Sequence, residues 1–241
     1  MRLRLRYGKM GKVRFVSHRD TARLWERALR KAALPVAYSG GYAPRPKLSF
    51  GLALPTCAES VAEYLDVDLD TSAPDDVDVD LDRISAGLPA GMDVLAGDTV
   101  DPRTMSLQEA VVACTWRIEA RGIGTDEADR LVHGALSAGE LVISRERKGK
   151  QVVDDLRPAL LHLAVAGPTA DGSELHAELA VHPRSVRPAE LLTALALSLA
   201  GGGLEAGRVQ RTHQWIERDG ARGEPLPLVA TSAQHAEARA S

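Results

Sequence analysis

The stretch SHRDTARLWERALRKAALP, residues 17–35, predicts a helix with one buried face and one basic face. Ser17 is typical of a helix N-cap, and Pro35 cannot continue a helix. Positions three and four residues apart share one side of a helix, and two stripes follow that spacing. The apolar stripe comprises Thr21, Leu24, Trp25, Ala28, Leu29 and Ala32. The basic stripe, which we expect to be exposed, comprises Arg19, Arg23, Arg27 and Arg30.

Strand-like segments flank this helix on both sides. RLRLRY (2–7) and AEYLDVDLD (62–70) alternate apolar and charged residues, which is typical of strands with one buried face. The other expected elements are an extended segment at 12–16, a strand at 47–54, a helix at 74–88 and a strand at 91–100. The order β-α-β-β-α-β predicts a ferredoxin-like unit, the split βαβ arrangement, over residues 1–103.

The second half of the chain repeats this order with one addition. We expect strands at 111–120, 160–166, 174–182 and 208–217, and helices at 125–138 and 188–200. The addition is a hairpin of 141–144 with 151–154 around the basic turn 145–150. The predicted class is therefore α+β, with two tandem ferredoxin-like units of antiparallel sheet, residues 1–103 and 104–217. Residues 218–241 lack periodicity and are expected to form a disordered tail.

Charge is distributed unevenly along the chain, although the net charge is only −3. Residues 1–50 contain 13 basic and two acidic residues, a net charge of +11. Residues 51–101 contain 13 acidic residues and Arg83 alone among the basic ones, a net charge of −12. Such segregation favours an anionic partner, nucleic acid first. The alternative is that the two segments fold side by side and neutralise each other.

The segment YSGGYAPRPKLSFG, residues 38–51, combines glycine, proline, aromatic and basic residues. Its glycines permit backbone angles that other residues resist, while its prolines restrict the shape of the loop. We therefore expect a preformed arm that contacts an anion. Arg45 and Lys47 would bind phosphate, and Tyr42 would stack on a base.

Composition narrows the possible classes of protein. No apolar run reaches the roughly 20 residues of a membrane span, and the N-terminus lacks the apolar core of a secretory signal. The two cysteines, Cys57 and Cys114, are far apart, as is common in a reducing compartment. We therefore expect a soluble cytoplasmic protein without a membrane partner.

The sequence also lacks the signatures of common cofactor and metal sites. No P-loop occurs, and no GxGxxG follows the first strand. None of the seven histidines pairs with another histidine, a cysteine or a carboxylate in a recognisable metal motif. The cysteines Cys57 and Cys114 are too few to hold the iron–sulfur cluster of a radical-SAM enzyme. We expect no cofactor and no metal.

His18, at the start of the first helix, is the one candidate for a catalytic residue. A neutral imidazole beside arginines could act as general base on an RNA 2′-hydroxyl, as in a metal-independent endoribonuclease. The alternative, which we favour, is a packing or capping role. It follows from the position of His18 seven residues before Trp25, near the apolar stripe.

Several motifs fall close together in residues 15–69. They are Phe-x-Ser-His-x-Asp (15–20), Leu-Pro (34–35), Tyr-Ser-x-Gly-Tyr-x-Pro-x-Pro-Lys-x-Ser-Phe (38–50) and Glu-Ser-x-x-Glu-Tyr-x-Asp (59–66). A second signature, RKGKQVVDDLRPAL (147–160), contains Lys148, Lys150, Asp155, Arg157 and Pro158. With these motifs the chain resembles the bacterial radical-SAM-linked domain of unknown function, in its stand-alone form, over most of residues 1–216.

The resemblance implies a protein partner for this chain, but it does not imply a reaction that the chain itself catalyses. Members of that family are fused to, or encoded beside, a cobalamin-binding radical-SAM protein, and they lie near genes for an RNase E/G-type ribonuclease and ribosomal proteins. The chain would then be an accessory protein of the radical-SAM enzyme. Its second signature would add Lys148, Lys150 and Arg157 to the cations that contact RNA.

Three functions are therefore open. The one we favour is a non-catalytic accessory protein that binds tRNA, rRNA or a precursor and presents it to a separate cobalamin-type radical-SAM enzyme. The second is a protein–protein adaptor whose basic N-terminal segment docks on an acidic partner without RNA. The third is the endoribonuclease that uses His18.

Overall fold

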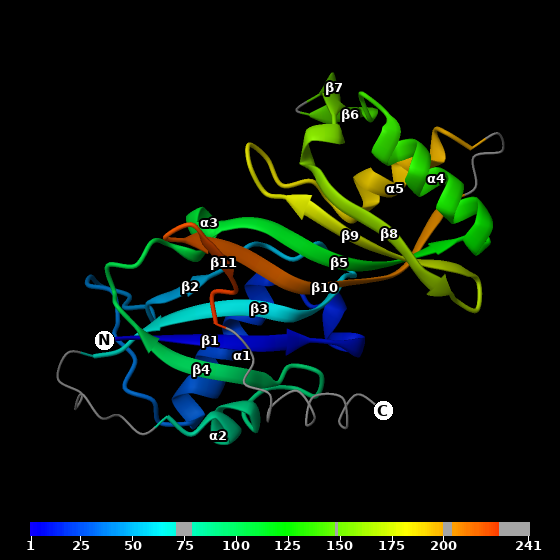
Figure 1. The fold of residues 1–241 in the computed structure, drawn as a ribbon. Helices are drawn as coiled ribbons and strands as arrows, with labels where there is room; N and C mark the ends of the chain where they lie inside the picture. Colours follow the sequence, from blue (N-terminus) through cyan, green and yellow to red (C-terminus); the bar gives the residue numbers. More distant parts are fainter. Residues whose placement is uncertain (71–78, 148, 200–203, 227–241) are drawn as a thin grey trace. The chain divides into compact units, whose positions relative to one another are not determined.

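The computed structural model describes residues 1–70, 79–147, 149–199 and 204–226, which form two compact units (Figure 1). Unit 1 contains residues 1–111 and the segment that starts at residue 215. Unit 2 contains residues 112–214. These boundaries differ from the expected 103 and 217, because the C-terminal segment returns to the first unit.

Unit 1 has the element order of a ferredoxin-like fold. Its elements are β1 (Arg2–Lys9), the 3-10 helix η1 (Gly11–Phe15), α1 (His18–Lys31), β2 (Leu48–Phe50), β3 (Glu59–Asp68), α2 (Leu81–Ser85), β4 (Val94–Val100), α3 (Leu107–Ala110) and β11 (Ala221–Gly223). The strands lie in the order β4-β1-β3-β2, and each neighbouring pair is antiparallel. The predicted α+β class and the split βαβ order are thus confirmed in this half.

Alternation along β1 separates apolar from charged side chains. Leu3, Leu5 and Tyr7 are buried in a core cluster with residues of α1. Tyr7 meets Trp25 of α1 edge to face, with ring centroids 4.9 Å apart. The arginines between these positions project to the other face of the sheet, because successive side chains of a strand alternate. The predicted apolar stripe therefore covers the sheet, and its buried members are Thr21, Trp25, Ala28 and Leu29.

Residues 12–16 are not extended, contrary to the sequence prediction. They belong mostly to η1, which buries Val13 and ends where the Val16 N–H donates to the Val13 carbonyl at 2.9 Å. Gly11 begins this turn with φ of 63°, a conformation that glycine adopts without strain. The alternation of polar and apolar residues at 12–16 is typical of a strand, and this pattern alone does not reveal a local turn.

The second helix of unit 1 is shorter than expected. α2 begins after Asp80, whose carboxylate accepts a hydrogen bond from the Arg83 N–H at 2.9 Å. This capping side chain places the start of the helix well inside the expected range of 74–88. Residues 74–78 of that range lie outside the described residues.

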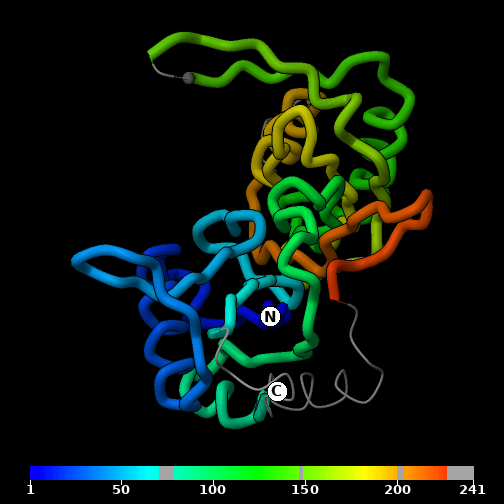
Figure 2. Tube along the Cα trace, turned by 90° about the vertical axis from the view of Figure 1, so that its left-hand side faces the viewer, coloured from blue at the N-terminus to red at the C-terminus, as the bar shows by residue number. Residues whose placement is uncertain are grey.

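Unit 2 repeats the ferredoxin-like order around an inserted hairpin. Its elements are β5 (Val111–Arg121), α4 (Thr125–Ser137), β6 (Val142–Arg147), β7 (Lys150–Asp155), η2 (Arg157–Ala159), β8 (Leu160–Pro168), β9 (Gly172–Ala180), α5 (Pro188–Ala196) and β10 (Glu205–Arg218), whose residues up to Gln214 belong to this unit. The strand order β10-β5-β9-β8 corresponds to β4-β1-β3-β2 of unit 1. β6 and β7 form a separate two-stranded sheet, the green hairpin that extends from unit 2 in Figure 2. The second predicted unit is confirmed, and the hairpin is an insertion before β8.

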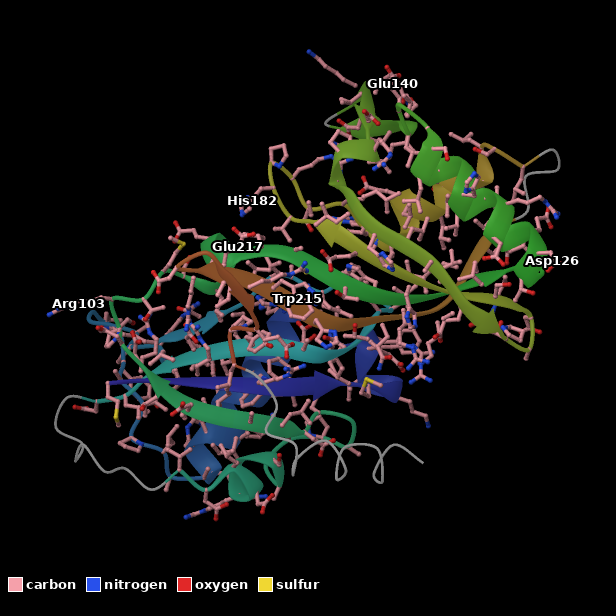
Figure 3. All side chains as sticks on the ribbon, viewed as in Figure 1. Arg103, Asp126, Glu140, His182, Trp215 and Glu217 are labelled. Atoms are coloured by element: carbon pink, nitrogen blue, oxygen red, sulfur yellow. The ribbon has the colours of Figure 1, made fainter. Side chains whose placement is uncertain are left out.

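The C-terminal segment is ordered as far as residue 226, whereas the sequence predicted a disordered tail from 218. β11 pairs with the end of β10, and the Arg222 guanidinium lies 4.5 Å from the ring centroid of Trp215, which is labelled in Figure 3. Arg6 Nη1 forms an ion pair with Glu224 at 2.8 Å. These long-range contacts order a segment that has no periodicity of its own. Residues 227–241 lie outside the described residues.

Candidate functional site

The arginine stripe of α1 is exposed, as its spacing predicted. All four of its members are open to solvent: Arg19, Arg23, Arg27 and Arg30. Arg23 Nη1 lies 3.1 Å from Asp20 Oδ1, and both side chains of this pair are more than half exposed. Exposed pairs contribute about 0–1 kcal/mol, so Arg23 can exchange this partner for another anion at little cost.

The arginines of β1 are instead neutralised by acidic residues. Arg4 Nε and Nη2 lie 2.7 and 2.8 Å from the two carboxylate oxygens of Asp66, and the two side chains are only 1% and 2% exposed. Arg2 pairs with Asp68 at 2.7 Å. The two sequence-based interpretations of the charge segregation thus apply to different elements, because strand cations are neutralised while helix cations are exposed.

The remaining exposed cations of residues 1–50 form what we call the basic set. Its members are Lys12, Arg19, Arg27, Arg30, Lys31, Arg45 and Lys47. Within the described ranges, none of the seven forms an ion pair with an acidic side chain. The basic set comes from η1, α1 and the loop 38–47. Lys12 and Lys31 were not singled out from the sequence, although their charge and position were visible there.

Hydrogen bonds hold the loop 38–47 in a defined shape. The Ser39 N–H donates to the Arg45 carbonyl at 2.8 Å, and the Arg45 N–H donates to Ser39 Oγ at 3.0 Å. Gly41 takes φ of 110° in the turn between them, a conformation that favours glycine. The loop extends from unit 1 as the light-blue arm in Figure 2. It is therefore an ordered arm that presents Arg45 and Lys47 to solvent.

Exposed aromatic side chains accompany these cations. Tyr42 is fully exposed, and Tyr38 in the same arm is 50% exposed. Phe15 is 56% exposed, and the Arg14 guanidinium lies 4.6 Å from its ring centroid. Of these three rings, only Tyr42 was expected from the sequence to contact RNA. Exposed rings among cations are the groups on which single-stranded bases stack.

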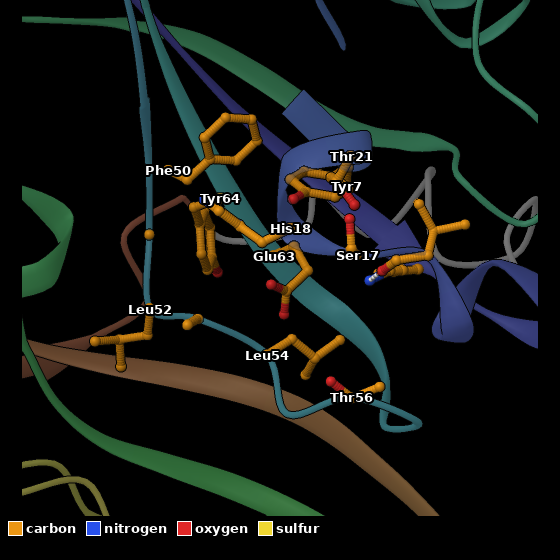
Figure 4. A pocket seen from close by; sticks show the side chains of 14 residues that line it. Tyr7, Ser17, His18, Thr21, Phe50, Leu52, Leu54, Thr56, Glu63 and Tyr64 are labelled. Atoms are coloured by element: carbon orange, nitrogen blue, oxygen red, sulfur yellow. Dashed lines mark hydrogen bonds between the residues drawn. The ribbon is translucent and has the colours of Figure 1, made fainter. Parts of the chain in front are cut away.

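A pocket of about 100 Å³ lies at the N-terminal end of α1 (Figure 4). The end of β1, the middle of β3, the first turn of α1 and the segment 50–56 surround it. In Figure 4, His18 and Thr21 project from the helix, Glu63 from β3, and Leu54 from the segment opposite. Three motifs that carry the sequence resemblance, at 15–20, 38–50 and 59–66, each contribute to its wall. This pocket could not be predicted from the sequence, because its residues meet only in the folded chain.

Buried polar groups line the pocket. Lys9 and Glu63 are 7% and 6% exposed, and Lys9 Nζ donates to the Val16 carbonyl at 2.7 Å. Burial lowers the pKa of Lys9, while the nearby Glu63 carboxylate opposes this shift. Thr21 is 3% exposed, and its Oγ1 has no hydrogen-bond partner among the residues that the structure describes. The pocket therefore offers both donors and acceptors to a small polar group.

His18 lies at the mouth of this pocket. Its exposed ring meets Phe50 edge to face, with centroids 5.0 Å apart and an interplanar angle of 76°. Ser17, not His18, caps the helix, because Ser17 Oγ accepts from the Asp20 N–H at 3.1 Å. In the described part of the chain no carboxylate is hydrogen-bonded to His18, although an orienting partner is usual for a catalytic imidazole.

The predicted cations of unit 2 differ in their surroundings. Lys150 is exposed at the start of β7. Arg157 is half-buried, and its Nη1 and Nη2 donate to the carbonyls of Leu160 and Leu136 at 3.2 and 3.0 Å. Its guanidinium thus satisfies a carbonyl near the end of α4. Lys148 lies outside the described residues.

Within the described ranges, no three or more histidine, cysteine, aspartate or glutamate side chains are grouped so that they could hold a metal ion. Cys57 is exposed and Cys114 is buried, and neither forms a disulfide within the described residues. In the same ranges, no helix combines the length and apolar character that crossing a bilayer requires.

Comparison with known proteins identifies a family. The family model described as "Uncharacterized protein conserved in bacteria (DUF2344)" matches residues 2–188. No curated protein matches the sequence. A solved structure titled "Crystal Structure of a Cbf5-Nop10-Gar1 Complex" contains a chain with a TM-score of 0.49 and 10% identity. The match covers 88% of the present chain but only 48% of that chain, and at this TM-score it carries no argument.

Proposed function

The chain belongs to the DUF2344 family of uncharacterized proteins conserved in bacteria, and we propose that its unit 1 binds RNA without catalysing a reaction on it. The observation that carries this proposal is the basic set, whose seven cations are exposed and form no ion pair within the described ranges. Phosphate binding needs exposed cations that are not already neutralised.

The aromatic side chains beside these cations favour RNA over an acidic protein surface. Binding to an acidic protein surface requires the cations but no exposed ring, whereas a single-stranded or looped RNA offers both phosphates for the cations and bases for stacking on the rings. Tyr42 lies between Ser39 and Arg45 of the ordered arm, so that a base on its ring places the neighbouring phosphates near the arm's cations. tRNA, rRNA and their precursors supply such loops.

We further propose that the chain presents this RNA to a separate cobalamin-type radical-SAM enzyme. This step rests on the sequence resemblance alone. The two cysteines, one exposed and one buried, are too few for the cluster of such an enzyme, so the chemistry would belong to the partner.

Fluorescence anisotropy with labelled tRNA tests the RNA proposal. We expect the double variants Arg27→Ala/Arg30→Ala and Arg45→Ala/Lys47→Ala each to weaken binding by about tenfold or more, since phosphate contacts supply most of the affinity. Arg130→Ala is the matched control, because Arg130 is also an exposed helix arginine but belongs to α4 of unit 2.

Two results would contradict the proposal. One is the absence of RNA binding at low salt. The other is an equal loss of affinity in Arg130→Ala and in the two double variants. If the protein instead co-purifies with the radical-SAM enzyme after nuclease treatment and binds no RNA, it is a protein–protein adaptor.

A further inference from the structure

One face of the unit 2 sheet carries the helices of that unit, and the opposite face carries polar side chains. α4 packs against β8 and β9, and α5 lies beside α4 (Figure 1). The side chains on the helix-covered face are apolar, such as Ile118 of β5 and Leu175 of β9, which are buried. Successive side chains of a strand alternate between the two faces. Arg117 of β5 and His176 of β9 therefore lie on the opposite face, and both are exposed.

Arg117 and His176 lie side by side at the centre of this polar face. The strand order β10-β5-β9-β8 makes β5 and β9 the central strands of unit 2. Arg117 is directly opposite His176 in the antiparallel pairing of these strands, and residues so placed have Cβ atoms about 4.5–5.5 Å apart. On β8, the residue opposite His176 is Ala164, whose small side chain leaves room beside the imidazole ring.

The carboxylate of Glu174 holds both planar groups by their edges. Arg117 Nε and Nη2 lie 3.0 and 2.8 Å from the two oxygens of this carboxylate. His176 Nε2 lies 3.0 Å from Glu174 Oε1. Because ring and guanidinium nitrogens form hydrogen bonds in the plane of their group, these contacts orient the two planes and leave their faces open. The side chains of Arg117 and His176 are accordingly 51% and 46% exposed.

The charges on the polar face favour a neutral group over its centre. Glu119, Glu174 and Glu178 lie there, and their carboxylates would repel a phosphate. The exposed cations Arg121 and Arg208 lie beside Glu119, which accepts from Arg121 Nη2 at 3.4 Å and from the Arg208 N–H at 2.8 Å. A single strand of RNA matches this distribution, with its uncharged bases over the centre and its phosphates near the two arginines.

We propose that the polar face of the unit 2 sheet binds an unpaired segment of the RNA, with two neighbouring bases stacked on Arg117 and His176. Unpaired bases stack on histidine rings and on guanidinium planes, and a four-stranded sheet with stacking side chains is a known platform for single-stranded RNA. A protein partner would need no pair of aligned planar groups, whereas stacked bases do. The inference rests on the proposed RNA binding of the chain and extends it from unit 1 to unit 2.

The test measures the affinity of the full chain for two labelled probes of equal length: oligouridylate and an abasic ribose-phosphate chain. Each probe is longer than the roughly 4–16 nucleotides that one single-strand-binding fold covers. Arg117→Lys keeps the charge and His176→Gln keeps an N–H for Glu174, but both remove the stacking surface. Each should weaken oligouridylate binding about fivefold or more and leave abasic binding unchanged. His176→Phe keeps a ring and should bind oligouridylate within about twofold of wild type.

Arg130→Lys is the matched control, because Arg130 is an exposed arginine of α4 and lies outside the polar face. It should leave the affinity for both probes unchanged. Since all these positions are exposed, each variant should melt within about 2 °C of wild type.

Two results would overturn the proposal while RNA binding by unit 1 stands. One is that Arg117→Lys and His176→Gln both keep the wild-type ratio of oligouridylate to abasic affinity. The other is that His176→Phe loses as much affinity for oligouridylate as His176→Gln does. If neither probe binds to the wild-type chain, the proposed function itself fails.

Discussion

Arg4 and Arg27 have the same guanidinium group, but the elements that carry them place one in an ion pair and the other in solvent. Arg4 projects from the charged face of β1, where Asp66 of the neighbouring strand binds it through both carboxylate oxygens. Arg27 projects from the solvent side of α1, where the described residues offer it no acidic partner. In the sequence, both belong to one basic segment. Only the pairing of β1 with β3 shows that Arg4 is neutralised by an acidic residue, whereas Arg27 remains available to bind an anion.

The buried Arg4–Asp66 pair should therefore be required for the stability of the fold. Asp66→Ala leaves the Arg4 guanidinium buried and unpaired, and we expect the free energy of unfolding to fall by about 3–5 kcal/mol. Urea denaturation measures this, with Arg27→Ala as a control that should change stability by no more than about 0.5 kcal/mol. A loss in Asp66→Ala as small as that of the control would show that the pair is not structural.

Arg157 should behave like Arg4, although the resemblance placed it among the cations that contact RNA. Its guanidinium donates to two backbone carbonyls, so Arg157→Ala should lower the free energy of unfolding by about 1–2 kcal/mol. tRNA affinity should stay within twofold of wild type. A loss of RNA affinity at unchanged stability would instead assign Arg157 to the RNA contact.

Among the elements, α1 was the most predictable and η1 the least. Two stripes at helical spacing, a serine cap and a terminal proline all indicated α1, and every one of these signals acts within the segment itself. η1 depends on Gly11 at a positive φ and on the burial of Val13, which alternation cannot encode. The pocket was unpredictable for another reason. Lys9 and Glu63 come from different strands and meet beneath α1 only after the sheet has formed.

The cap of α1 yields a prediction about pH. Ser17→Ala removes the oxygen that accepts from the Asp20 N–H, and we expect a loss of about 1 kcal/mol at pH 7. The hydrogen bond from the Ser17 hydroxyl also lowers the pKa of Asp20. Stability from a lowered carboxyl pKa is present above the unfolded pKa and is lost as pH falls through the folded pKa.

The stability difference between wild type and Ser17→Ala should therefore shrink as pH falls below about 4, near the ordinary pKa of an aspartate. Urea denaturation at pH values from about 3 to about 7, roughly one unit apart, follows this difference. A difference that stays constant over the series would mean that the carboxylate of Asp20 contributes nothing to the cap.

Over the whole molecule the net charge is only −3, yet some basic residues of unit 1 are neutralised by acidic residues and others are not. Asp68 and Asp66 of β3 neutralise Arg2 and Arg4 of β1, while η1, α1 and the ordered arm retain the basic set. The two ferredoxin-like units were predictable because each strand and helix carries its own periodicity. Their boundaries were not, because the contacts of residues 215–226 with unit 1 are long-range.

The salt dependence of RNA affinity tests the central claim most directly. The logarithm of the tRNA association constant should fall linearly with the logarithm of salt concentration, with a slope of roughly −0.7 for each phosphate contact to single-stranded RNA. The quadruple variant Arg27→Ala/Arg30→Ala/Arg45→Ala/Lys47→Ala should reduce the magnitude of this slope by roughly three if each cation makes one contact. An unchanged slope in that variant, or wild-type affinity that does not depend on salt, would contradict the assignment of the basic set as the RNA-binding surface.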